Sequence, residues 1–121
     1  LATGLAARGY VVLTIDHPFE SAVVRLADGA LALPVAFPAG DGQQRMAELQ
    51  TLRAADLLFV VAQLKDGHLF DAFRGRLDVE RIAVIGHSFG GAASIEAALL
   101  DPSLRAVSNI DGTVYGATHG R

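Results

Sequence analysis

The stretch RIAVIGHSFGG, residues 81–91, constrains the fold more than any other part of the chain. Its apolar start favours a strand buried on both faces of a parallel sheet, and the small residues after Ser88 favour a helix close to that strand. Gly86, Ser88 and Gly90 fit the G-x-S-x-G pattern, in which a serine occupies a strained turn between strand and helix. Glycine on each side of the serine removes Cβ atoms that would clash where strand and helix approach each other. The stretch therefore predicts a strand–serine–helix unit.

Two further apolar runs indicate strands of the same sheet, Tyr10–Asp16 before the serine and Leu104–Asp111 after it, beside the strand Arg81–Gly86. The apolar spacing predicts two helices: Gln43–Lys65, with an apolar face of Met46, Leu49, Leu52, Val60 and Leu64, and Ser88–Leu100, ended by Asp101 and Pro102. Strands that alternate with helices predict an α/β fold with a parallel sheet, right-handed crossovers and flanking helices.

The N-terminal part and the connector before the serine strand carry weaker signals. Residues 1–8 resemble the end of a helix that stops at Gly9, and Asp28-Gly29 favours a hairpin turn within Ser21–Phe37. Residues 68–80 form a polar connector in which we expect at most one helical turn. Because no repeat or low-complexity linker divides the chain, we expect residues 1–121 to form a single domain.

The composition argues against several classes of function. Hydrophobic residues make up 51% and charged residues 19%, which favours a folded domain over disorder. The formal net charge of −3, without a basic stripe, argues against nucleic acid as the main partner. The chain has no cysteine, so a thiolate nucleophile or a cysteine-based zinc site is excluded.

The remaining composition signals concern metals, membranes and location. The 4 histidines lack metal-ligand spacing, so we expect no metal and no cofactor, and a metal-dependent hydrolase is a remote alternative. No apolar run approaches the roughly 18 residues that a membrane-spanning helix needs. The sequence indicates no cellular compartment.

A serine hydroxyl becomes a useful nucleophile only with a base that an acid orients. We assign Ser88 as the nucleophile and the N–H of Phe89, at the start of the helix, as an oxyanion donor. Asp111 is the predicted acid, because it ends the strand that follows the serine helix and parallel sheets place their sites at such strand ends. Asp16 precedes the serine, against the usual Ser…Asp…His order, and Asp101 fits a structural turn.

The base is the least defined member of the predicted site. His87 adjoins Ser88 and fits a packing role, while His17 and His68 lie on a strand end and a connector. His119 follows Asp111 in the expected order but by only eight residues, where a helix and a strand usually intervene, so it is a doubtful base. These residues alone do not identify the catalytic histidine.

The sequence resembles α/β-hydrolases of the platelet-activating-factor acetylhydrolase-like group, together with bacterial esterases and dienelactone-hydrolase-like proteins. The resemblance rests on GYVVLTIDHPFES, LDVERIAVIGHSFGGAA and RAVSNIDGTVYG, and covers roughly residues 5–116. It implies Ser88 as nucleophile, Asp111 as acid and the Phe89 N–H in the oxyanion hole. Members of that group also carry an oxyanion loop before the helix that begins at Leu1, and a catalytic histidine well downstream of the acid. The matching residues contain neither element.

We therefore expect a serine hydrolase that cleaves small carboxylic esters through an acyl-enzyme on Ser88. The alternative is a non-catalytic α/β-hydrolase fragment or pseudo-enzyme used for binding or assembly. The chain does not start with methionine, and we expect it to be part of a longer protein. Alone, residues 1–121 should be a poor catalyst, and apolar sheet edges should favour pairing with a second copy or with the rest of a larger fold.

Overall fold

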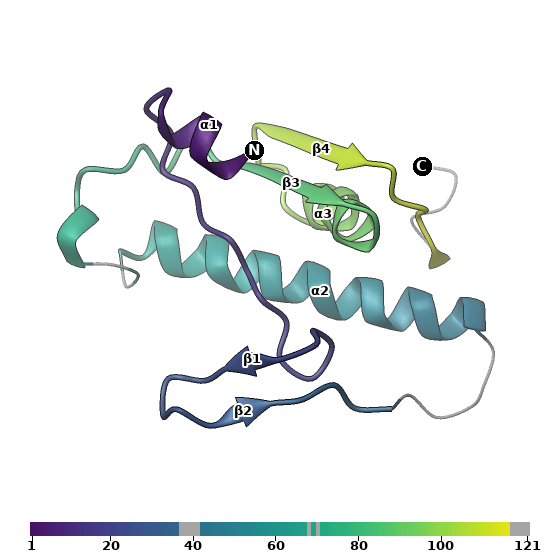
Figure 1. Ribbon diagram of the computed structural model, residues 1–121. Helices are drawn as coiled ribbons and strands as arrows, with labels where there is room; N and C mark the ends of the chain where they lie inside the picture. The colour runs from purple at the N-terminus through teal and green to yellow at the C-terminus, as the bar shows by residue number, and fades with distance from the viewer. Residues whose placement is uncertain (37–41, 68, 70, 117–121) are drawn as a thin grey trace. The chain divides into compact units, whose positions relative to one another are not determined.

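The computed structural model describes residues 1–36, 42–67, 69 and 71–116 (Figure 1). The chain divides into two compact units, residues 1–39 and 40–121, which we describe separately. The single-domain assignment of residues 1–121 stays a prediction.

The N-terminal unit contains a short helix and a small hairpin. Helix α1 spans Ala2–Ala6, and Gly9 follows it with a φ of 89°, a left-handed conformation that suits glycine. Strands β1 (Val24–Arg25) and β2 (Leu31–Ala32) pair antiparallel. The predicted helix end at Gly9 and the predicted hairpin are confirmed.

The Asp28-Gly29 turn explains why the hairpin forms at this place. Gly29 has a φ of 87°, and an oxygen of the Asp28 carboxylate accepts a hydrogen bond from the Ala30 N–H at 2.9 Å. The aspartate thus closes the turn with its own side chain, while the glycine adopts the left-handed backbone without strain.

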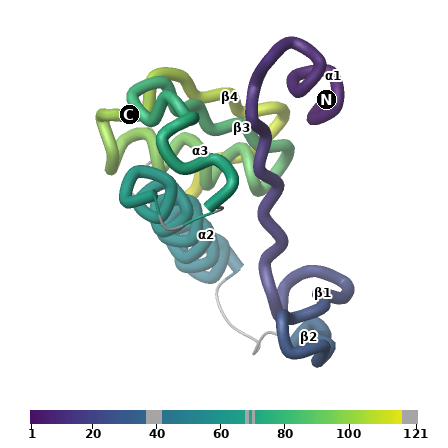
Figure 2. Tube along the Cα trace, turned by 90° about the vertical axis from the view of Figure 1, so that its left-hand side faces the viewer, coloured from purple at the N-terminus to yellow at the C-terminus, as the bar shows by residue number. Residues whose placement is uncertain are grey.

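The predicted strand at Tyr10–Asp16 is wrong. The segment runs between α1 and β1 (Figure 2), but among the described residues it joins no strand ladder. Apolar and β-branched side chains favour an extended backbone, yet a strand exists only where its N–H and C=O groups pair with a neighbour. The expected third parallel strand is therefore missing from the described sheet.

The second unit contains the other predicted elements in the predicted order. These are α2 (Gly42–Lys65), the short 3₁₀ helix η1 (Asp71–Phe73), β3 (Ala83–His87), α3 (Phe89–Leu100) and β4 (Ala106–Ile110). Strands β3 and β4 pair in parallel, in a register that runs from Ala83 opposite Ala106 to His87 opposite Ile110. The two helices, the parallel strand pair and the single helical turn of the connector are confirmed.

Helix α3 packs against both β3 and β4, and also against α2 (Figure 1). The core consists of small and branched residues, namely Ala54, Val61, Val84, Ala92, Ala93 and Ala97. Alanines on α3 allow its backbone to approach its neighbours closely. The buried residues of α2 are Gln50, Ala54 and Val61, whereas Leu52 of the predicted apolar face is 53% exposed. The helix was predicted correctly, and the other four residues of the predicted apolar face are half-buried.

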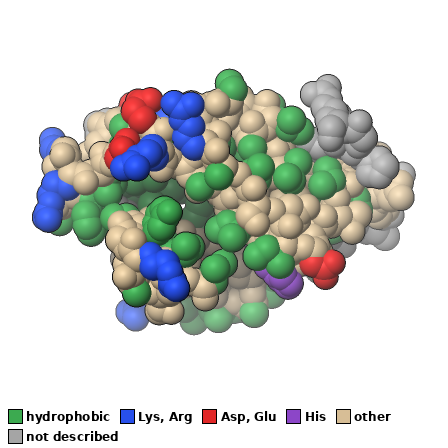
Figure 3. All heavy atoms as spheres, turned by 90° about the horizontal axis from the view of Figure 1, so that it is seen from above, with side chains coloured by type: hydrophobic (Ala, Val, Ile, Leu, Met, Phe, Trp, Pro, Cys, Tyr) green, Lys and Arg blue, Asp and Glu red, His purple; other side chains and the backbone are tan. Residues whose placement is uncertain are grey.

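Within the described residues, one face of the β3–β4 pair is packed and the other is exposed. Val84 is 7% exposed on the α3 side, whereas the next residue, Ile85, is 44% exposed. Because side chains alternate along a strand, His87 shares the face of Ile85 and points away from α3. Hydrophobic side chains are visible at the surface in the view of Figure 3. The expectation that β3 is buried on both faces is therefore wrong for the described residues, and pairing with a second copy stays a prediction.

Candidate active site

Ser88 lies between the last residue of β3 and the first residue of α3, as the sequence predicted. Its φ of 52° and ψ of −125° are rarely adopted by residues with a side chain. Its N–H donates to the Ile110 carbonyl oxygen at 2.8 Å, which extends the β3–β4 pairing into the turn. Ser88 stands at the N-cap position of α3, yet its side chain makes no capping hydrogen bond and the residue is exposed. The hydroxyl is therefore not used to end the helix.

Glycines allow β3 and α3 to meet at this sharp angle. A Cβ atom at Gly86 would overlap the Gly90 carbonyl group and lie 2.5 Å from the Gly91 nitrogen. A Cβ at Gly91 would overlap the Asn109 amide oxygen and lie 2.9 Å from the Gly86 carbonyl oxygen. A Cβ at Gly90 would meet nothing within 4 Å, so the steric reason expected for Gly90 is wrong. The close approach requires glycine at Gly86 and Gly91.

Asp111 follows the last residue of β4 and is exposed. Its φ is 59°, and among the described residues the non-glycine residues with positive φ are Phe19, Ser88 and Asp111. Gly112 lies against the start of α3, because a Cβ there would overlap the Ser88 carbonyl oxygen and lie 2.9 Å from the Ala92 nitrogen. The structure thus brings the backbones at Ser88 and Asp111 together at one end of the parallel sheet.

Phe89 begins α3, so its N–H has no acceptor within the helix. Its ring lies between groups from two other segments. The guanidinium carbon of Arg53 on α2 is 4.8 Å from the ring centroid, and the Tyr115 ring centroid is 6.2 Å away with the planes tilted by 59°. These contacts join Phe89 to α2 and to the segment that follows Asp111.

Gln50 on α2 is fully buried and joins three segments of the unit. Its side-chain oxygen accepts from the Tyr115 N–H at 2.8 Å. Its nitrogen donates to the Tyr115 carbonyl oxygen at 3.3 Å and to Glu96 Oε2 on α3 at 2.6 Å. The other Glu96 oxygen accepts from the Thr51 hydroxyl at 2.7 Å. Gln50 was not predicted as a site residue, although its spacing from Ala54 and Val61 places it in the buried stripe of the helix.

Asn109 on β4 is the second residue that the sequence analysis missed. Its amide oxygen accepts from the Gly112 N–H at 2.8 Å, and its amide nitrogen donates to the Gly112 carbonyl oxygen at 2.9 Å. The partner is only three residues away, so the Asn-x-Asp-Gly order was a local signal for this turn.

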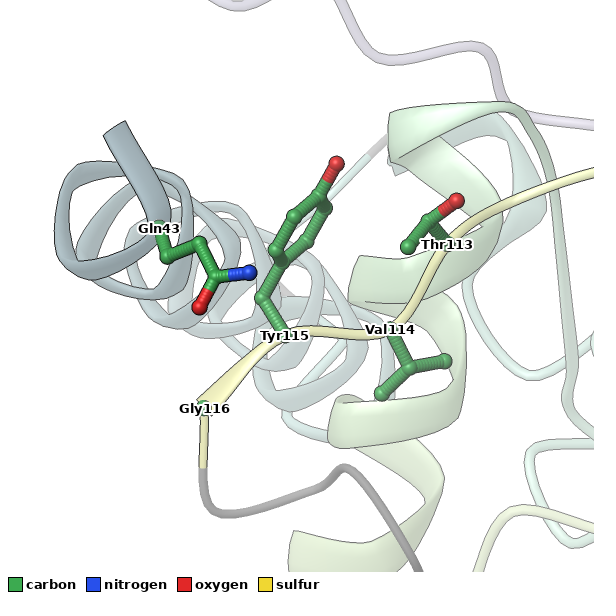
Figure 4. Close-up of a pocket in the computed structure, with 5 residues that line it drawn as sticks. All are labelled: Gln43, Thr113, Val114, Tyr115 and Gly116. Carbon is green, nitrogen blue, oxygen red and sulfur yellow. The ribbon is translucent and has the colours of Figure 1, made fainter.

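A pocket of about 360 Å³ lies next to the turn at Asp111. It is lined by Gln43 of α2 and by Thr113–Gly116, and Figure 4 shows the Gln43 and Tyr115 side chains close together at its wall. This volume is within the range of small-molecule pockets. Over the part of the chain that the structure describes, no group of three or more histidine, aspartate or glutamate side chains is arranged to hold a metal ion.

A family model for platelet-activating factor acetylhydrolase, isoform II, matches residues 40–117, which is more than half of the chain. The chain belongs to this family. The match coincides with the second structural unit up to residue 117 and contains α2, Ser88 and Asp111. The acetylhydrolase-like resemblance predicted from the sequence is confirmed.

A curated relative of this chain comes from Arthroderma benhamiae and is named "Probable 1-alkyl-2-acetylglycerophosphocholine esterase". It is 29% identical over 119 residues, which cover 96% of this chain. The chain spans only 27% of the length of that relative. No solved structure matches the chain.

The described part of this chain does not supply an evident base. His87 is exposed on the sheet face opposite α3, and His17 lies in the N-terminal unit. His68 and His119 fall outside the described residues. The role of His119 therefore stays a prediction, as do the roles of Ser88, Phe89 and Asp111. No helix in the described ranges is long and apolar enough to cross a membrane.

Proposed function

We propose that this chain carries the nucleophile and the acid of a serine esterase with an α/β-hydrolase core. The observation that carries the proposal is the backbone of Ser88, which is strained and uncapped and lies against the Asp111 turn. Strain of this kind clusters at functional sites, where the surrounding structure holds it. A serine with only a structural role at this position would be expected to cap the helix.

In the proposed reaction, Ser88 Oγ attacks the ester carbonyl carbon and its proton passes to a histidine. The carbonyl electron pair moves to the oxygen, which accepts a hydrogen bond from the Phe89 N–H. When this intermediate collapses, the alcohol leaves with the proton from the histidine, and the acyl group stays on Ser88. Water then releases the acid by the same steps. Asp111 orients the histidine and stabilises its positive charge.

We further propose that residues 1–121 belong to one α/β-hydrolase domain. The histidine and a second oxyanion donor would come from segments outside the described residues, with His119 as one candidate for the base. The mechanism uses no metal and no cofactor. The curated relative is named as an esterase of an acetylated glycerophosphocholine. We propose short-acyl esters of this kind as the substrate class of the present chain. The pocket beside Thr113–Gly116 lies next to the Asp111 turn, but neither Ser88 nor Asp111 lines it.

The test uses the full gene product with p-nitrophenyl acetate and a 1-alkyl-2-acetylglycerophosphocholine as substrates. A fluorophosphonate should label Ser88, as mass spectrometry of the tryptic peptides would show, and Ser88→Ala should abolish both labelling and turnover. Asp111→Asn should lower kcat by roughly 10⁴, the loss found when an acid of this type is neutralised. Ser94→Ala is the matched control, because Ser94 is buried in α3 and bonded to the Gly90 carbonyl oxygen. Labelling at another residue, or full turnover by Ser88→Ala, would reject the proposal and favour a non-catalytic role.

A further inference from the structure

Two side-chain amides hold the backbone that follows Asp111. Asn109 accepts from the N–H and donates to the C=O of Gly112, at 2.8 and 2.9 Å. Gln50 accepts from the N–H and donates to the C=O of Tyr115, at 2.8 and 3.3 Å. Each amide therefore bonds both the backbone N–H and the backbone C=O of one residue, which is how a neighbouring strand bonds a residue in a sheet. Asp111 lies within the turn that Asn109 closes on Gly112, and Tyr115 follows four residues later.

The orientation of the Gln50 amide is set by Glu96. The Gln50 nitrogen lies 2.6 Å from Glu96 Oε2, and an ionised carboxylate can only accept hydrogen bonds. Turning the amide over would place its oxygen against the carboxylate and lose both bonds to Tyr115. Glu96 is in turn held by the Thr51 hydroxyl through its other oxygen. Because Gln50 is fully buried, water cannot replace its partners.

The turn held by these amides is itself strained and packed against the nucleophile. Asp111 has a φ of 59°, which a non-glycine residue keeps only where its surroundings hold it. The Ser88 N–H is bonded to the Ile110 carbonyl oxygen, and Gly112 leaves no room for a Cβ beside the Ser88 carbonyl oxygen. A shift of the turn would therefore move the carboxylate relative to Ser88.

We propose that Gln50 and Asn109 are positioning residues that fix the Asp111 carboxylate with respect to the nucleophile. This inference rests on the proposed function, since it assigns a task to the predicted acid. Neither amide touches the reacting atoms, and both act through the backbone of the Asp111 turn. If Gln50 merely joined α2 to α3, its loss would change stability without a specific dependence on Asp111.

The decisive experiment is a double-mutant cycle in the full gene product, measured with p-nitrophenyl acetate. Gln50→Met keeps the length of the side chain and removes its hydrogen bonds. We expect kcat to fall by about tenfold to a hundredfold with little change in KM, because small misplacements of catalytic groups cost rates of this order. In the Asp111→Asn background the same change should lower kcat by less than about threefold, since residues that act as a unit are not additive.

Gln44→Met is the matched control, because Gln44 lies on the same helix, is exposed and donates to Glu48 at 3.2 Å. It should leave kcat unchanged. If Gln50→Met does not fold, Gln50→Glu combined with Glu96→Gln provides the second variant, since this exchange keeps one hydrogen bond between the two side chains. It should retain more activity than Gln50→Glu alone.

Asn109→Asp extends the cycle to the second amide. It keeps the acceptor for the Gly112 N–H but removes the donor to the Gly112 carbonyl oxygen. The fold-loss of kcat caused by Asn109→Asp should also be smaller in the Asp111→Asn background than in the otherwise unchanged protein.

Equal losses of kcat in the two backgrounds, or an unchanged kcat in Gln50→Met, would overturn the positioning role while leaving the proposed esterase intact. Full activity of Asp111→Asn alone would instead overturn the assignment of the acid, and the positioning role with it.

Discussion

Replacing Ser88 by glycine should make the protein more stable than replacing it by alanine. Ser88→Ala removes no capping hydrogen bond and keeps a side chain at a φ of 52° and a ψ of −125°. The strain of such a backbone costs about 1–3 kcal/mol, and glycine relieves most of it. The greater freedom of glycine in the unfolded chain offsets about 0.5–1 kcal/mol of that gain. We expect Ser88→Gly to exceed Ser88→Ala in free energy of unfolding by about 0.5–2 kcal/mol.

Urea unfolding of the full gene product at neutral pH, followed by circular dichroism, measures this difference. Both variants lack the Ser88 hydroxyl, so their difference in stability does not depend on that group. Ala98→Gly, within the same helix, provides a control of opposite sign and should destabilise by about 1 kcal/mol, since α3 has ordinary helical backbone there. If the free energy of unfolding of Ser88→Gly were no higher than that of Ser88→Ala, the conclusion that the Ser88 backbone is strained would be refuted.

Two further predictions concern the same unit. Gly86→Ala should destabilise by about 3 kcal/mol, the upper end of the range for overpacking, because its Cβ would meet backbone atoms. Gly90→Ala should be neutral or slightly stabilising, because a Cβ there meets open space. Equal losses of stability for the two variants in urea unfolding would contradict this prediction. Hydrogen bonds from the Ser103 hydroxyl and N–H lower the pKa of Asp101, and the Lys65 ammonium lowers it further. The ionised Asp101 carboxylate therefore stabilises the fold above its unfolded-state pKa. This contribution is lost as the pH falls below about 4 through the folded-state pKa. Asp101→Asn should therefore reduce the loss of stability between pH 5 and pH 3, and an unchanged urea-midpoint difference between these pH values would count against it.

The elements that were predicted correctly depend on signals close together in the sequence. The β3–Ser88–α3 unit follows from an apolar run, the glycine spacing and the small residues after Ser88. The hairpin follows from Asp28-Gly29, whose side chain and φ act within the turn. In these places the local preference and the final structure agree, so a pattern of a few residues was sufficient.

The failures depend on partners that are distant in the sequence. Tyr10–Asp16 has the composition of a strand, but composition does not supply the neighbour that a strand needs. Gln50 reaches Tyr115, 65 residues away, and no periodicity predicts that a polar residue in a buried stripe pairs with that backbone. The predicted triad is similarly divided. Ser88 and Asp111 lie together because β3 and β4 are neighbours, whereas the candidate base His119 falls outside the described residues.

The backbone gives a reason to connect the two catalytic predictions. An ordinary N-cap serine has extended backbone angles and accepts a hydrogen bond from the first turn of its helix. Ser88 has neither feature, so the chain forgoes a cap worth about 1 kcal/mol and keeps a strained residue in its place. Asp111, which faces the same helix start across the β3–β4 pairing, also has a positive φ without being glycine. Two strained residues at adjoining strand ends are hard to explain by packing alone, because glycine at either position would relieve the strain. A requirement for the hydroxyl and the carboxylate themselves accounts for both, which is why the esterase proposal is preferred to a purely structural turn.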